Sequence, residues 1–315
     1  MRRTSSIIAV ALLALCLAAS GCAPKISGAV KDDSSRTGIK DDLAPTGGYT
    51  GPKLRVGVVN FQNKTPSRVL GIGEAAADIL GTILQKTDRF IIIPQQDMAS
   101  ILDQQAMGAS GVIDPTTAAK MGKVLGLNAI VTGAITAYSE AEEGQDLLIY
   151  QKKKQIARVT VDYRIVDTTT GIQIMADSGQ GEYAKSTGGA LGLGSRSTYD
   201  ADLRDGALRD ALTKAMVNML KQLEETDWNG RIADVKGQTV YINAGKKTGL
   251  KVGDILVVQE LGDMIYDPQT RAAIGYAPGR IKGELMVTAF FGNDGSVAMV
   301  RSGTGFKTND LVRMK

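Results

Sequence analysis

The chain of 315 residues contains no histidine and only two cysteines, Cys16 and Cys22, both close to the N-terminus. These absences exclude a His-based catalytic triad and an imidazole metal site. The glycine-rich stretches GIGEAA at Gly71 and GGALGLG at Gly188 match neither a dinucleotide fingerprint nor a P-loop. We therefore predict a protein that is not an enzyme and binds no cofactor or metal, a carboxylate-only hydrolase being the open alternative.

The sequence also lacks a hydrophobic run long enough to cross a bilayer. The apolar segment Ile7–Leu17 has about 11 residues, whereas a membrane helix needs about 20. Arg2 and Arg3 precede this segment and small residues follow it, which is the pattern of an export signal. We expect residues 1–21 to be a signal peptide rather than a permanent anchor.

The signal ends in ASGC, and small residues directly before a cysteine resemble a bacterial lipobox. The resemblance implies that Cys22 carries fatty acyl chains such as palmitate and becomes the first mature residue, with Ala19 where Leu is more usual. Because Ala23 and not Asp follows, it implies sorting to the outer membrane, with the body facing the periplasm. An ordinary signal cut nearby, with Cys22 incidental, is the alternative.

Charge of one sign is not in large excess. The chain has 37 Lys and Arg against 33 Asp and Glu, a net charge of +4. The run Lys152–Lys154 is short, and we interpret it as a solvated turn. The balance therefore predicts no nucleic-acid partner.

Composition divides the mature chain into a linker and two folded parts. Residues 22–53 are rich in Gly, Pro, Ser, Asp and Lys without an apolar period, so we predict a flexible tether. Residues 54–226 alternate strand-like and helix-like patterns, and residues 227–315 contain only strand-like patterns separated by turn residues.

The first folded part predicts an α/β sandwich. LRVGVVNF, RFIIIP and AIVTGAI are β-branched strands, and apolar residues from Ile72 to Leu84 recur at helical spacing. In ARVTVDYRIVD apolar and polar residues alternate, as in a half-buried strand. A last amphipathic helix is expected from Asp202 to Glu224.

This order of elements resembles the CsgG family, the curli production assembly/transport component, over roughly Leu54–Leu223. The resemblance rests on VGVVNFQNKT, RFIIIPQQDMASILDQQ, GLNAIVTGAI followed by Tyr138, and QIARVTVDYRIVDTTTGIQI. It implies that lipidated subunits form a ring-like homo-oligomer, each adding two β-hairpins to a barrel through which unfolded protein subunits leave the cell.

The lengths available for such hairpins differ. Only 16 residues separate Tyr138 from Gln155, and they are acidic, so we expect this limb to be too short for lipid unless flanking residues extend the strands. The stretch Ser178–Asp202 is long enough, and a mobile loop is its alternative interpretation. Its apolar tip is a possible membrane or assembly hairpin, formed by Gly188, Gly189, Ala190, Leu191, Gly192, Leu193 and Gly194.

The second folded part predicts a small all-β, barrel-like domain. KGQTVYINAGKKTGLKVGDILVV, with DPQT at Asp267–Thr270, resembles the C-terminal β module of the flagellar protein FlgT. Such modules mostly mediate protein contacts or bind envelope polymers.

Two functions follow as hypotheses. The first is an outer-membrane lipoprotein for assembly and secretion of curli-like or other surface filament subunits, acting as an oligomer. The alternative is a periplasm-facing scaffold without a pore, which binds an envelope protein of the peptidoglycan-synthase or flagellar-ring type.

Overall fold

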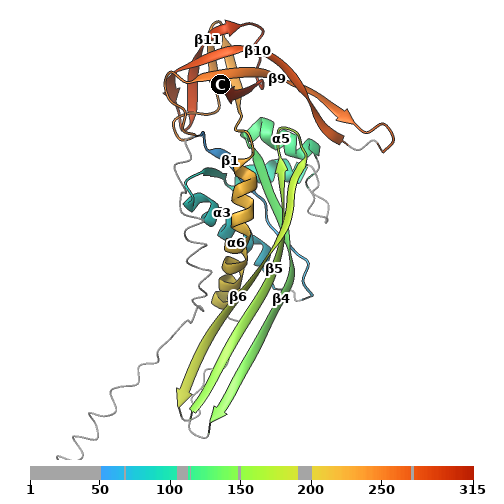
Figure 1. Ribbon diagram of the computed structural model, residues 1–315, viewed down its shortest axis with the longest axis vertical. Coiled ribbons are helices and arrows are strands. Elements are labelled where there is room, and N and C mark those ends of the chain that lie inside the picture. The colour runs from blue at the N-terminus through green and yellow to red at the C-terminus, as the bar shows by residue number, and fades with distance from the viewer. Residues whose placement is uncertain are drawn as a thin grey trace, which may run out of the picture.

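The computed structural model describes residues 51–66, 69–104, 113, 115–147, 150–190, 201–270 and 273–315. The predicted signal peptide and nearly all of the predicted tether lie outside these ranges. The described chain forms a mixed six-stranded sheet with four helices, followed by a closed six-stranded barrel (Figure 1).

The sheet combines a parallel and an antiparallel half, in the order β3-β1-β4-β5-β6, with β2 beside β4. Strand β1 lies parallel to both β3 and the start of β4, while β4, β5 and β6 are antiparallel to one another. The strands are β1 (Leu54–Val58), β2 (Gln62–Asn63), β3 (Phe90–Ile93), β4 (Ala129–Leu147), β5 (Tyr150–Asp167) and β6 (Gln173–Ala190).

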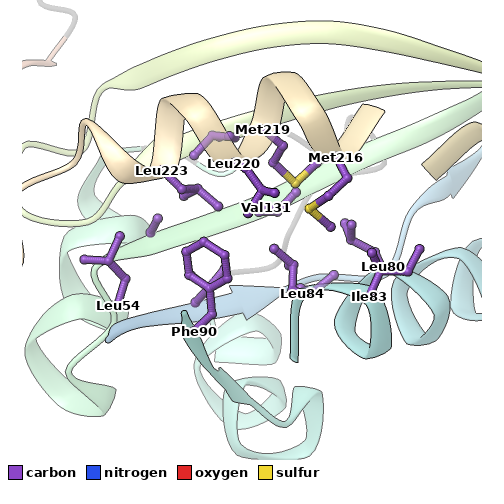
Figure 2. Packing of buried hydrophobic residues seen from close by; sticks show 14 of the residues in the cluster. Leu54, Leu80, Ile83, Leu84, Phe90, Val131, Met216, Met219, Leu220 and Leu223 are labelled. Carbon is purple, nitrogen blue, oxygen red and sulfur yellow. The ribbon is translucent and has the colours of Figure 1, made fainter. Parts of the chain in front are cut away.

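Helices lie on both faces of the sheet, with α6 (Ala201–Glu224) mainly against β5 and β6. Helices α3 (Ile72–Lys86) and α6 pack on one face, and α4 (Gln95–Gln104) and α5 (Pro115–Leu125) form a separate core on the other. Figure 2 shows Met216, Met219 and Leu220 of α6 close to Val131 of β4, with Leu84 of α3 below them. The helical periodicity of α3 and α6 therefore predicts the buried stripe correctly.

The antiparallel half is longer than the helices that cover it. Strands β4, β5 and β6 have 19, 18 and 18 residues, and in Figure 1 they run well past the start of α6. The described residues of the expected limb, 139–147 and 150–154, are therefore strand, because β4 and β5 pair with each other as far as Leu147 and Tyr150.

The C-terminal part is a closed barrel with the strand order β10-β11-β8-β7-β12-β9. Strands β9 and β10 continue beyond the barrel as a two-stranded arm (Figure 1). The strands are β7 (Gly230–Lys236), β8 (Thr239–Ile242), β9 (Ile255–Tyr266), β10 (Ala273–Phe291), β11 (Gly295–Gly303) and β12 (Leu311–Met314).

The expected fold class is confirmed only in part. The barrel-like C-terminal domain is present, but the N-terminal part is a mixed sheet whose strands dominate, and it is not clearly an α/β sandwich. The reason is the length of β4, β5 and β6, since helices pack on only part of each strand.

Candidate functional site

The three-stranded extension has two strand edges that no described strand covers. On one side β4 pairs with β1 and β2 only as far as Ile135, and from Ala137 to Leu147 its described partner is β5 alone. On the other side β6 pairs only with β5 along its whole length. Among the described residues, a subunit therefore presents one open edge at each side of the extension, and open edges are templates for pairing with another chain.

One point on the β6 edge is protected by α6. The backbone N–H of Glu182 donates to Asp210 Oδ2 at 3.0 Å, so this N–H points away from β5. Asp210 is held in turn by Lys214, one helical turn further on, at 2.8 Å. Because N–H directions alternate along a strand, those of Ser178 and Gln180 also point outward.

Close backbone packing holds α6 against the β5–β6 half of the extension. An ideal Cβ on Gly181 would collide with the backbone of Ala207 and Ala211, and one on Gly179 would lie 2.6 Å from the carbonyl oxygen of Ala211. Only glycine allows helix and strand to approach this closely. The ring of Tyr183 lies over Gly206 in the same way.

A cluster of polar side chains binds the C-terminal half of α6 to β5 and β6. The Tyr163 hydroxyl lies 3.2 Å from both Asp177 Oδ2 and the carbonyl oxygen of Ala215, and Asn218 Nδ2 donates to Asp177 at 2.9 Å. Burial and the neighbouring carboxylate raise the pKa of Tyr163, so it stays a neutral donor. The Asn218 hydrogen bond and the Ser178 amide hold the pKa of Asp177 below its ordinary value.

Past α6 the described residues of the extension belong to β4, β5 and β6. The first turn of α6 reaches Lys185, whose ammonium group lies 4.0 Å from Asp202. Each strand then has five more described residues: EGQDL in β4, YQKKK in β5 and STGGA in β6. Five residues span about 17 Å. A strand that crosses a membrane needs 9 to 11 residues, about twice as many.

The predicted hairpin tip is only partly within the described residues. Gly188, Gly189 and Ala190 form the end of β6, where they pair with Lys152, Gln151 and Tyr150 of β5. Residues 191–194 and the predicted lipid-attachment residue Cys22 lie outside the described ranges. Both assignments therefore stay predictions.

The junction between sheet and barrel is a polar network that sequence patterns do not reveal. Arg55 in β1 pairs with Asp294 of the β10–β11 turn, with 2.9 Å between Nη2 and Oδ2. Asn128 Nδ2 donates to the carbonyl oxygen of Asn229, and Asn229 Nδ2 donates to Thr169 Oγ1. Both asparagines are buried, which makes these bonds costly to break.

Burial and hydrogen bonding at the junction shift the pKa values of Asp294 and Arg231. Burial raises the pKa of Asp294, but the hydrogen bonds from the Thr248 hydroxyl and amide and from Arg55 outweigh it and hold the pKa below its ordinary value. Burial lowers the pKa of Arg231, whose Nε donates to the carbonyl oxygen of Gly122 in α5.

Within the part of the chain that the structure describes, no group of three or more acidic, Cys or His side chains is placed to hold a metal ion. No described helix is both long enough and apolar enough to cross a membrane.

Fold and site define a class of two-domain proteins in which a mixed sheet with two open strand edges is joined to a closed barrel. A family model described as "Curli production assembly/transport component CsgG" matches residues 44–252, about two thirds of the chain. The chain belongs to the CsgG family. The match extends past the expected boundary at residue 226 into the barrel.

A curated relative comes from Neisseria meningitidis serogroup B and is named "Putative lipoprotein". It is 27% identical over 231 residues, which cover 70% of this chain and 96% of the relative.

Two solved structures are weaker matches. Lipoprotein GNA1162 from Neisseria meningitidis is 17% identical, with a TM-score of 0.33, over 53% of this chain and 98% of that one. The C-terminal domain of LpoB from Salmonella enterica is 12% identical, with a TM-score of 0.30, over 45% and 90%. Both TM-scores lie below 0.5, so neither match bears on function.

Proposed function

We propose that this chain is a non-enzymatic lipoprotein of the outer membrane, attached through Cys22 and facing the periplasm, whose copies assemble edge to edge. In this assembly β6 of one subunit pairs with β4 of the next. The observation that carries the proposal is the pair of open edges on opposite sides of one extension. Membership of the CsgG family and the name of the meningococcal relative support the lipid anchor.

An association of this kind is heterologous, because two different edges meet. Heterologous contacts give closed rings when the rotation between subunits closes, and filaments when it does not. A ring of such sheets is suited to the family role, so we propose that the assembly takes part in transporting curli-like or other surface filament subunits.

A second candidate is a periplasm-facing scaffold that has no pore. It is favoured by the charged sequences of the strand ends beyond α6, EGQDL in β4 and YQKKK in β5. A strand that faces lipid needs one apolar set. The scaffold could still assemble through the same edges and bind an envelope partner.

The assembly is tested with a proline on the β6 edge. Gln180→Pro removes an outward N–H without removing a β5–β6 hydrogen bond, and Gln180→Thr is the matched control. In detergent extracts, native mass measurement should give a multimer for the parent chain and Gln180→Thr, and a monomer for Gln180→Pro. A parent chain that is monomeric at all concentrations would contradict edge-to-edge assembly.

Anchoring and pore formation are tested separately. Cys22→Ser should release the folded body into the soluble periplasmic fraction, or leave unprocessed precursor, whereas full membrane retention with normal maturation would contradict the anchor. Conductance of the purified multimer in planar bilayers supports transport through a pore. A stable multimer without conductance supports the scaffold.

A further inference from the structure

A cavity of about 180 Å³ lies between the sheet domain and the barrel. The β5–β6 turn at Thr169 and Thr170 forms one wall, and β9, β10 and β12 form the other. About six water molecules occupy this volume in liquid water. It is well below the roughly 300 Å³ or more of a small-molecule site. The cavity therefore suits one side chain of a longer ligand.

The cavity is lined by a cation that has no acidic partner among the described residues. Arg313 of β12 lies in the wall, and its buried Nε has no hydrogen-bond partner in the described chain. Glu260 in the same wall lies 3.4 Å from Lys282, which also binds Asp310 at 2.8 Å. The one carboxylate in the cavity thus already faces another cation.

Behind this wall, Arg231 donates to the carbonyl oxygens of Gly122 and Asn309 and has no carboxylate partner in the described part. Arg231, Lys282 and Arg313 lie on β7, β10 and β12 of the barrel, and within the described residues only Lys282 has carboxylate partners, Glu260 and Asp310. An uncompensated charge in a desolvated place is unfavourable, and one more carboxylate would offset it.

An open strand edge begins at the same place. Strand β12 pairs with β9 only over Leu256–Gln259, and from Glu260 to Tyr266 the described partner of β9 is β10 alone. These residues form the arm that leaves the barrel in Figure 1. A two-stranded hairpin is only marginally stable in water, and a third strand would stabilise it.

The arm also offers apolar contacts. Ile265 and Tyr266 are 46% and 54% exposed, and Ile274 on the opposite strand is 51% exposed. A peptide added as a strand uses backbone hydrogen bonds along the edge and pockets for alternate side chains. Here the edge, the apolar residues and the cation-lined cavity follow one another along β9.

We infer that the arm and cavity form a docking site for an extended peptide segment of a partner protein, which adds as a third strand along β9 and places an Asp or Glu side chain beside Arg313. This site goes beyond the proposed function, because its residues belong to neither β4 nor β6. Its test can therefore fail while edge-to-edge assembly stands, and the reverse.

The test uses the full mature chain and three fluorescent eight-residue peptides of alternating Thr and Val. The first carries one central Glu and has blocked ends, the second carries Gln instead, and the third has no Glu but a free C-terminal carboxylate. The Glu peptide should bind about tenfold more tightly than the Gln peptide. Equal binding of these two, or tighter binding of the third, would overturn the proposal.

Two variants test whether Arg313 is the cation that interacts with the Glu side chain of the peptide. Arg313→Gln should bring the Glu and Gln peptides to within about twofold of each other, since it removes the cation but keeps a polar side chain. Arg301→Gln changes an arginine that is paired with Glu284 elsewhere on the barrel, and it should preserve the difference. Loss of the difference in both variants, or in neither, would contradict the role of Arg313.

Hydrogen exchange tests where on the protein the peptide binds as an added strand. Binding of the Glu peptide should slow exchange of amides between Glu260 and Tyr266 and leave those of β4 and β6 unchanged. Protection confined to β4 or β6 would assign the peptide to the assembly edges and overturn the docking site. Both variants are first compared with the parent by circular dichroism, and Arg313→Met, which also removes the cation, serves in place of Arg313→Gln should the latter not fold.

Discussion

The guanidinium group of Arg55 and the carboxylate of Asp294 meet at 2.9 Å, although 239 positions separate them in the chain. Arg55 belongs to the first strand of the sheet, and Asp294 to a turn of the barrel. Their side chains are only 17% and 8% exposed, and Asp294 also accepts two hydrogen bonds from Thr248. The barrel is therefore fixed to the sheet by a largely desolvated ion pair.

Removing one partner of this pair should be strongly destabilising. Asp294→Asn leaves Arg55 buried without its carboxylate, and we expect the free energy of unfolding to fall by about 3 kcal/mol. Urea unfolding followed by circular dichroism measures the change. Arg158→Gln is the control, because it breaks an exposed pair with Glu182 and should cost less than about 1 kcal/mol. Equal losses would contradict a special role for the junction.

The same carboxylate predicts a dependence on pH. The pKa of Asp294 is lowered in the folded chain, so the folded state binds the proton less readily than the unfolded state does. Its stabilisation is complete above the unfolded pKa of about 4 and is lost as the pH falls through the lower folded value. Between pH 5 and pH 2 the parent should thus lose stability more steeply than Asp294→Asn. Parallel curves would show that Asp294 does not contribute.

The sequence predicts elements better than their extent. Periodicity locates α3 and α6 because their buried stripes are long and regular. From the sequence we interpret the acidic residues after Tyr138 as a short limb. We interpret the run Lys152–Lys154 separately, as a solvated turn. In the structure β4 and β5 run antiparallel through both segments, and Glu143 faces Lys154 with 3.7 Å between the charged groups. Cross-strand pairing of opposite charges supports a strand that local propensity does not indicate.

The contacts of the site are harder to predict still. Asn128 and Asn229 are 101 positions apart, and nothing in either segment indicates that their side chains are buried together. The cavity beside Arg313 combines a turn of the sheet domain with three barrel strands. Such groupings follow from how the two domains dock, which strand and helix periodicities do not encode.

The packing of α6 on β6 gives a steric prediction. Gly181→Val introduces a Cβ into the space of the Ala207 carbonyl and the Ala211 amide, and backbone cannot move aside as a flexible side chain can. We expect a loss of about 3 kcal/mol in the free energy of unfolding. Hydrogen exchange should show the earliest loss of protection in α6.

Its control is a glycine with room for a side chain. A Cβ on Gly81 of α3 would meet only Ile92, at an ordinary contact distance of 3.7 Å. Gly81→Ala should stabilise the chain by about 0.5 to 1 kcal/mol, because alanine favours helix. Destabilisation by Gly81→Ala, or a neutral Gly181→Val, would contradict this account of the two positions.

The barrel contains a second buried ion pair, and the stability lost when it is broken can be measured by tryptophan fluorescence. Lys282 Nζ lies 2.8 Å from both carboxylate oxygens of Asp310, and the two side chains are 2% and 6% exposed. Lys282→Met leaves Asp310 charged and buried, so we expect a loss of about 3 to 5 kcal/mol. Trp228 is the single tryptophan and lies beside Gly230 at the start of β7, so its fluorescence can follow the unfolding.

Two further variants separate charge from packing at this pair. Lys315→Met removes an exposed cation from Glu284 and should cost less than about 1 kcal/mol. Adding Asp310→Asn to Lys282→Met removes the unpaired charge but keeps a side-chain oxygen for the amide of Lys307, which donates to Asp310 at 2.7 Å. The double variant should therefore be more stable than Lys282→Met alone, since burying a neutral amide costs far less than burying an isolated carboxylate. A double variant that is less stable than Lys282→Met would show that packing of the lysine chain, and not the stranded charge, sets the loss.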